Sequence, residues 1–187
     1  MKYLFFLLLG FTVLFTTGCE DDDAVANNEE LLRHDGSNVT GPTLGAGLHE
    51  FAARFTSNEL VAVQGRQLDA IRFYLGQIPS SVEVVIYGQG TIDSPGPERY
   101  SRNITNRITT TGWQEHRILE DIELLDEDIW FSIAVLHQDV QQSVGCDAGP
   151  AQPGGDQIFR ATDPNWITFR SIGESVNWNI RGVLRPE

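Results

Sequence analysis

The sequence predicts an all-β domain, an antiparallel β-sandwich of the jelly-roll type, on the strength of three observations. About eight to ten short segments alternate apolar and polar residues with a period of two, which is typical of half-buried strands. No segment carries a helical pattern longer than about two turns. Turn-forming residues separate the segments at regular spacing, as in sandwiches, and no repeat of the length found in propellers or solenoids is present.

The first half of the domain begins with an alternating segment at residues 51–55, where Phe51 and Phe55 share one parity. Residues 56–63 predict a short helical turn, because Thr56 and Glu59 have the spacing of a capping box. Two further half-buried strands are predicted at residues 71–75 and 82–86.

The second half contains the segment with the strongest apolar character. Residues 128–137 are apolar on both parities, which predicts a central strand covered on both sides. Further strands are predicted at residues 112–120, 165–173 and 175–185. In the last of these, one face is predicted to point inward (Val176, Trp178, Ile180, Leu184) and the other outward (Asn177, Asn179, Arg181, Arg185).

Residues 1–18 have the layout of a secretory signal peptide. A charged start at Lys2 precedes an apolar run that ends at Phe15, and small residues follow it. The apolar run is shorter than the roughly 20 residues that a membrane span needs.

The residues around Cys19 resemble a bacterial lipobox, in which small residues precede a cysteine that becomes the mature N-terminus. Thr17 and Gly18 fit this pattern, whereas Thr16 departs from the leucine usual at its place. The resemblance implies that Cys19 carries acyl chains. Two or more such chains hold a protein stably at a membrane, so the membrane is an expected partner.

An acidic block follows at Glu20, Asp21, Asp22 and Asp23. A block of like charges is typical of a solvated spacer. The block is also similar to the surface-export signals of lipoproteins from the Bacteroidota, which implies attachment at the outer membrane or cell surface; a periplasm-facing location remains open. Residues 19–47 are therefore expected to form a flexible tether, with one helical turn at residues 29–33, and residues 48–187 to form the sandwich.

The charge balance argues against a nucleic-acid partner. The chain has 26 acidic and 13 basic residues, a net charge of −13, and its only lysine is Lys2. Binding of a phosphate backbone depends on clustered Lys and Arg, and the sequence has no such cluster.

Most of residues 48–187 resembles a β-sandwich module found in secreted and surface proteins of the Bacteroidota. The strand contexts of Trp113, Trp130 and Trp178 carry the resemblance, together with the loop at residues 145–150. Many copies of the module have Gly-x-Asp-x-Gly-Pro in this loop, which Gly145, Asp147, Gly149 and Pro150 match. The resemblance implies a module without catalytic residues.

The long loop at residues 143–157 is the candidate binding site, since binding tends to lie on irregular loops of a rigid scaffold. Its candidate residues are Gly145, Asp147, Gly149, Pro150 and Asp156, with Trp166 as an exposed aromatic residue beside them. Asp147 and Asp156 are also possible calcium ligands, because calcium prefers carboxylate and carbonyl oxygens. No other cofactor is expected. A connection that only covers one end of the sandwich is the alternative for this loop.

The sequence favours a non-catalytic binding or adhesion module for a glycan or a protein. It contains no nucleophile motif, and its scattered histidines, expected at the surface or at strand ends, lack zinc-ligand spacing. The alternative that stays open is a secreted hydrolase, a glycosidase or peptidase, which would use a carboxylate pair or Cys146. His137 is the histidine nearest to Cys146 in the sequence.

Overall fold

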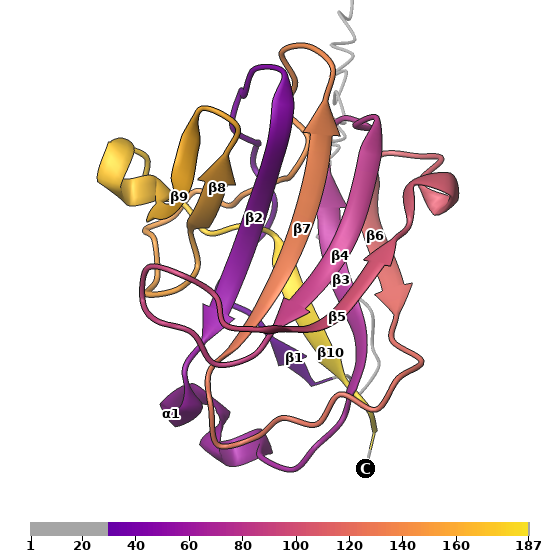
Figure 1. The fold of residues 1–187 in the computed structure, drawn as a ribbon, viewed down its shortest axis with the longest axis vertical. Coiled ribbons are helices and arrows are strands. Elements are labelled where there is room, and N and C mark those ends of the chain that lie inside the picture. The colour runs from indigo at the N-terminus through magenta and orange to yellow at the C-terminus, as the bar shows by residue number, and fades with distance from the viewer. Residues whose placement is uncertain (1–29, 187) are drawn as a thin grey trace, which may run out of the picture.

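The computed structural model describes residues 30–186, and two antiparallel sheets packed face to face make up the domain (Figure 1). This confirms the sandwich that the sequence predicts. One sheet has six strands in the order β5-β4-β7-β2-β8-β9, and the other has four in the order β1-β10-β3-β6. In chain order the strands are β1 (Leu31–Leu32), β2 (Gly47–Phe55), β3 (Leu68–Leu75), β4 (Ser81–Tyr87), β5 (Glu98–Asn103), β6 (Gly112–Arg117), β7 (Ile129–His137), β8 (Gln157–Arg160), β9 (Asp163–Thr168) and β10 (Ile180–Leu184).

The helical elements are short. The predicted turn after the first long strand is confirmed as α1 (Ser57–Leu60), followed by the 3-10 turn η1 (Val61–Val63). The Thr56 backbone N–H donates to the Glu59 carboxylate at 2.8 Å, as a capping box requires. Two further 3-10 turns are η2 (Thr105–Arg107) and η3 (Phe169–Ile172). Within residues 30–186, no helix has the length and apolar character needed to cross a bilayer.

The core lies between the two sheets and is built by the period-two pattern. Phe51, Phe73, Phe131 and Trp178 are fully buried there. β7 lies between β4 and β2, and all its residues except one are buried, which confirms the predicted central strand. Gly182 of β10 allows the sheets to approach closely, because a Cβ at this position would lie 2.4 Å from a ring carbon of Phe131.

The N-terminal part of the described chain departs from the prediction. Residues 30–47, expected to belong to the tether, pack on the sandwich, and β1 pairs with β10 through Leu31 opposite Val183. The helical turn expected at residues 29–33 is wrong for Leu31 and Leu32, which are extended. Pairing with β10 gives their backbone groups partners that an isolated turn of helix would lack.

The strand 175–185 is shorter than predicted and its polar residues are not in solvent. Trp178 and Ile180 point inward as expected, but Asn177, Asn179 and Arg181 are also buried. The reason is that the N-terminal segment covers this second face: the Arg181 Nε–H donates to both carboxylate oxygens of Asp35, at 3.1 and 2.9 Å. Burial raises the pKa of Asp35, while the Arg181 guanidinium opposes this shift.

Besides β1, two more strands are not predicted from the sequence. β5 has one buried residue, Tyr100, and an otherwise polar composition, and β8 has only four residues. The strand expected at residues 165–173 ends at Thr168, where η3 begins. The predicted signal peptide, the lipidated Cys19 and the acidic block lie outside the described residues.

Candidate functional site

The carboxylate of Asp147 is buried under the predicted binding loop and holds it in place through hydrogen bonds. Its Oδ1 accepts hydrogen bonds from the backbone N–H groups of Gly149 (2.8 Å) and Asn177 (2.7 Å). Its Oδ2 accepts from the Gly36 N–H (3.0 Å) and the Asn177 amide (2.9 Å). Burial opposes ionisation of Asp147, but the hydrogen bonds from Asn177 and the backbone outweigh it and hold the pKa below its ordinary value. The carboxylate therefore joins the loop to the segment before β10 and to the N-terminal segment.

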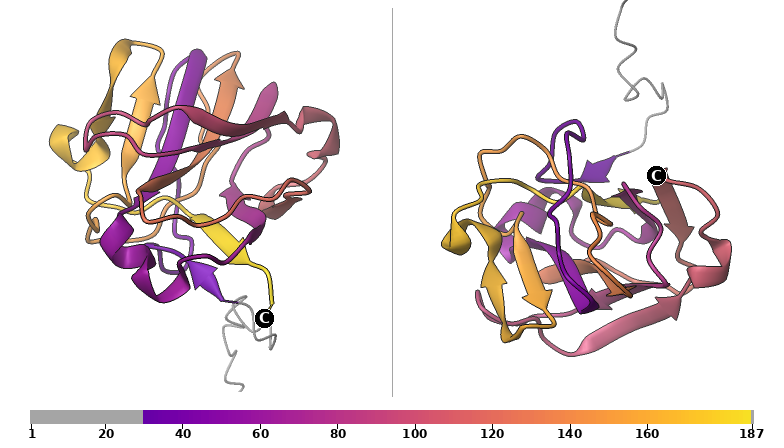
Figure 2. Two further views of the ribbon diagram at one scale, coloured as in Figure 1. Left: turned by 60° about the horizontal axis from the view of Figure 1, so that its bottom comes forward. Right: turned by 90° about the horizontal axis from the view of Figure 1, so that it is seen from above.

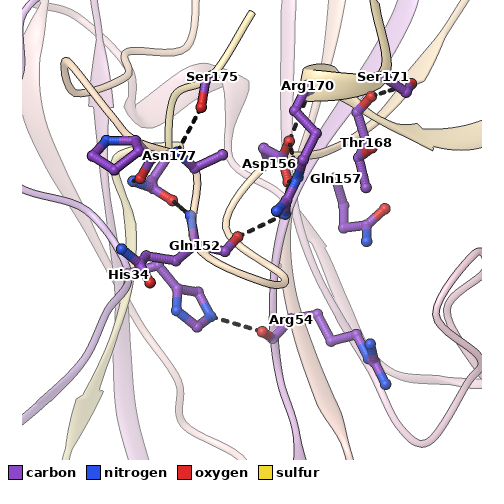
Figure 3. A network of polar contacts seen from close by, with 12 residues as sticks. His34, Arg54, Gln152, Asp156, Gln157, Thr168, Arg170, Ser171, Ser175 and Asn177 are labelled. Atoms are coloured by element: carbon purple, nitrogen blue, oxygen red, sulfur yellow. Dashed lines mark hydrogen bonds and ion pairs between the residues drawn. The ribbon is translucent and has the colours of Figure 1, made fainter.

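Asp156 is fully buried and is also occupied within the domain (Figure 3). It forms an ion pair with Arg170, whose Nη2 lies 2.6 Å from Oδ1, and it accepts the Arg170 backbone N–H at 2.9 Å. Arg170 also donates to the Gln152 carbonyl at 2.7 Å, and the Gln152 N–H donates to Asn177 Oδ1 at 2.6 Å. Across residues 30–186, no three His, Cys, Asp or Glu side chains are grouped so that they could hold a metal ion.

The remaining residues of the predicted loop have structural surroundings as well. Gly145 is buried, and a Cβ there would lie 2.3 Å from Asn38 Oδ1. Gly149 has a φ of +73°, and the carbonyl of the exposed Pro150 accepts the Asn177 amide at 3.1 Å. The loop residues are therefore brought together, but they point into the domain.

Cys146 is buried and lines a groove. Burial, with smaller effects of Asp147 and Glu174, raises the pKa of the Cys146 thiol to about 11. His137 is also buried, and its Nε2 is hydrogen bonded to Ser143 Oγ at 2.7 Å. The groove has a volume of about 470 Å³, and its lining also includes residues 40–44 and the connection from η3 to β10. Three of the four histidines, His49, His116 and His137, are buried rather than at the surface.

A different cluster lies on the face of the six-stranded sheet that points away from the core, which we call the outer face. Glu50 of β2 accepts hydrogen bonds from the Tyr87 hydroxyl (2.8 Å) and the Ser132 hydroxyl (2.6 Å). These three residues come from the adjacent strands β2, β4 and β7. Burial raises the pKa of Glu50, and the neighbouring carboxylates Glu83 and Glu98 raise it further, against the effect of the two hydroxyl donors.

Aromatic side chains adjoin this cluster. Trp130 is fully buried on the outer face, because the core-facing residues of β7 are those of the opposite parity. The half-buried Trp166 packs edge-on against it with ring centres 5.8 Å apart. The Arg54 guanidinium lies 5.9 Å from the centre of the Trp130 ring and is paired with Asp128. Trp166, predicted as exposed, is thus the partly accessible edge of an aromatic group.

The loop that joins β4 to β5, residues 88–97, crosses in front of β2 and β7 on this face (Figures 1 and 2). The side-chain amide of Gln157 donates to the Ile92 carbonyl at 3.1 Å. The outer face therefore has a half-buried polar part around Glu50 and a covered part under this loop.

The outer face is not predicted as a site from the sequence. Period-two alternation does place Glu50, Tyr87 and Ser132 on the outward side of their strands. Their convergence depends on the strand order β4-β7-β2, which joins residues far apart in the chain.

No known protein family matches the sequence, and none of the curated proteins does. Among solved structures, the chain is similar to the crystal structure of the cysteine protease and lectin-like domains of Cwp84, a surface layer associated protein of Clostridium difficile. The similarity has a TM-score of 0.56 at 11% identity and covers 75% of this chain and 32% of the other. The chain thus spans about a third of that protein's structure, and an identity this low shows a shared fold alone.

Proposed function

We propose that the protein is a non-catalytic binding module, held at the bacterial outer membrane or cell surface through lipid on Cys19, that takes a glycan on the outer face. The membrane attachment rests on the apolar run and the residues around Cys19. The acidic block at residues 20–23 supports an orientation toward the outside of the cell. A protein ligand on the same face is the alternative.

The choice of a glycan rests on two features of the outer face. One is Glu50 with its hydroxyl partners, and the other is the partly accessible ring of Trp166. Sugar rings present hydroxyls that donate to carboxylate oxygens and to the lone pairs of a tyrosine hydroxyl, and their apolar C–H faces pack on indole rings. Both kinds of group lie on one broad sheet face supported by a packed core. The similar solved structure includes a lectin-like domain beside a cysteine protease domain, but it shares only the fold, so the choice of a glycan rests on the outer face.

The test is a glycan and protein array probed with the lipid-free chain from residue 20. We expect binding to a glycan that is weakened about tenfold or more by Glu50→Gln and by Trp166→Ala, since each removes a direct contact. Glu115→Gln and Trp113→Ala, which alter the four-stranded sheet, are the matched controls and should bind normally once circular dichroism shows that they fold. A glycan bound equally by the parent and both outer-face variants would place the site elsewhere.

One observation favours a second candidate, a glycosidase on the same face. A carboxyl group with a raised pKa beside other carboxylates is the arrangement that supplies a general acid, and Glu50 has this environment with Glu83 and Glu98. Release of reducing sugar from a polysaccharide, lost in Glu50→Gln, would favour the hydrolase over the binding module. A thiol mechanism is disfavoured because a nucleophilic cysteine needs a lowered pKa, and burial raises that of Cys146.

A further inference from the structure

The covered part of the outer face has a floor of small side chains. Ala52 of β2 lies opposite Ser132 of β7 on one side and Gln157 of β8 on the other. Ala52 and Ser132 are fully buried although they point away from the core. Their burial requires a cover on this face, and the loop at residues 88–97 crosses there (Figure 1).

Two polar atoms beside this floor have no hydrogen-bond partner. They are the indole Nε1 of Trp130 and the amide Oε1 of Gln157, and their side chains belong to residues that are 0% and 1% exposed. Buried polar groups are nearly always paired in folded proteins, so each unpaired group calls for a reason. One atom is a donor and the other an acceptor. A hydroxyl group can accept from the first and donate to the second.

The loop itself is attached to the sheet by a contact that a ligand hydroxyl could replace. The Ile92 carbonyl accepts the Gln157 amide at 3.1 Å. The tip is a short turn closed by the Thr91 N–H donating to the Ser94 carbonyl at 2.8 Å, and the Ile92 side chain is 63% exposed. The loop base is closed by a separate contact, in which the Gly88 N–H donates to the Pro97 carbonyl at 2.9 Å.

We propose that the β4–β5 loop covers a second saccharide subsite, in which Trp130 Nε1 donates to, and Gln157 Oε1 accepts from, hydroxyls of a sugar ring. The subsite rests on the proposed glycan binding and extends it along the sheet from the polar part at Glu50. Ser132 belongs to the floor and donates to Glu50, so it joins the two parts. A ligand that fills both is therefore an oligosaccharide rather than a single sugar, and its binding displaces the loop tip.

The experiment measures binding of hexasaccharides of β-1,4-linked glucose, xylose and N-acetylglucosamine and of α-1,4-linked glucose by calorimetry. The variants are Trp130→Phe, which keeps an aromatic ring but removes the N–H, and Gln157→Leu. We expect each to weaken hexasaccharide binding about tenfold, the effect of one lost hydrogen bond to a buried partner. The control is Trp113→Phe, which should bind as the parent does. Thermal unfolding checks that all variants fold.

Hydrogen exchange of the parent provides a readout that does not depend on these variants. Bound hexasaccharide should speed exchange of amides at residues 91–94 while it slows exchange in β2 and β7. If binding depends on Glu50 and Trp166 but is unchanged in Trp130→Phe and Gln157→Leu, with no change in the loop, the subsite is overturned and the proposed function stands. If no hexasaccharide and no arrayed glycan binds, both are overturned together.

Discussion

Arg181 shows how one residue can join the N-terminal segment to the sandwich. Its guanidinium donates to both oxygens of Asp35 and to the Gly36 carbonyl (3.1 Å), and it lies 4.2 Å from the centre of the Trp113 ring. Asp35 and Arg181 are both buried. A buried ion pair adds little compared with apolar packing, but loss of one partner leaves an uncompensated charge.

Asp35→Ala should therefore destabilise the domain by about 3–5 kcal/mol, the cost of breaking a buried pair. Urea unfolding followed by tryptophan fluorescence measures this change. Glu115→Ala is the control, because Glu115 pairs with Arg72 at an exposed position, and exposed pairs contribute about 1 kcal/mol or less. Equal losses in the two variants would contradict the structural role assigned to Asp35.

Glu50 leads to a prediction about pH. Its pKa in the folded protein is raised above the ordinary 4.5 by burial and by the neighbouring carboxylates. The protonated form therefore favours the fold, so its contribution is complete below the ordinary pKa and is lost as the pH rises through the raised value. Glu50→Gln, which mimics the protonated form, should melt at a higher temperature than the parent at pH 7.

The advantage of Glu50→Gln should shrink as the pH is lowered toward 4, where Glu50 of the parent becomes protonated too. Differential scanning calorimetry between pH 4 and 8 measures it. An advantage that grew toward low pH would mean that Glu50 is stabilised as the ionised carboxylate.

At the scale of elements, the N-terminal segment contributes to the stability of the domain, which the sequence did not predict. A chain that begins at residue 30 should unfold like the full chain from residue 20, because β1 and Asp35 are retained. A chain that begins at residue 48 should lose at least about 4 kcal/mol, since it loses Asp35, the partner of Arg181 and Asn179. Thermal and urea unfolding of the three chains measure the difference. Equal stability of all three would mean that residues 30–47 do not stabilise the domain, as expected for a tether that ends at residue 47.

The long strands were predictable because burial on one face imposes a period of two, as in β3 and β4, and burial on both faces imposes a continuous apolar run, as in β7. β1 was not, since two leucines after two glutamates fit a helical turn as well as a strand, and only the partner β10 decides. β5 was not predictable either, because it lies at the edge of the sheet and has mostly polar residues, so it lacks a clear apolar alternation.

The candidate site was harder to predict than the fold. Asp147 and Asp156 are candidate ligands in the sequence because they are acids in an irregular loop. The sequence does not reveal that backbone N–H groups bind the carboxylate of Asp147 and that Arg170 binds that of Asp156. The outer face needs the strand order of the six-stranded sheet. That order follows from how the whole core packs, and no local pattern encodes it.

At the scale of the whole molecule, the proposed anchor separates the roles of the two cysteines. Cys19→Ala should release the protein from the membrane fraction, because burial of acyl chains supplies the attachment. Cys146→Ala is the matched control: this thiol is buried in the domain, so the variant should stay in the membrane fraction. Detergent partition followed by intact-mass measurement distinguishes them, and a Cys19→Ala protein that remained with the membrane would contradict lipidation at this residue.

The early start of the folded domain sets a limit on its distance from the membrane. If folding began at residue 48, the chain from Cys19 could span roughly 100 Å when fully extended. Because β1 begins at Leu31, residues 20–30 separate it from Cys19, and a segment of this length can span at most roughly 40 Å. A domain of this size is itself about 40 Å across. If Cys19 is lipidated as proposed, the sandwich therefore lies within about one domain diameter of the bilayer, so a ligand must be reached at that distance.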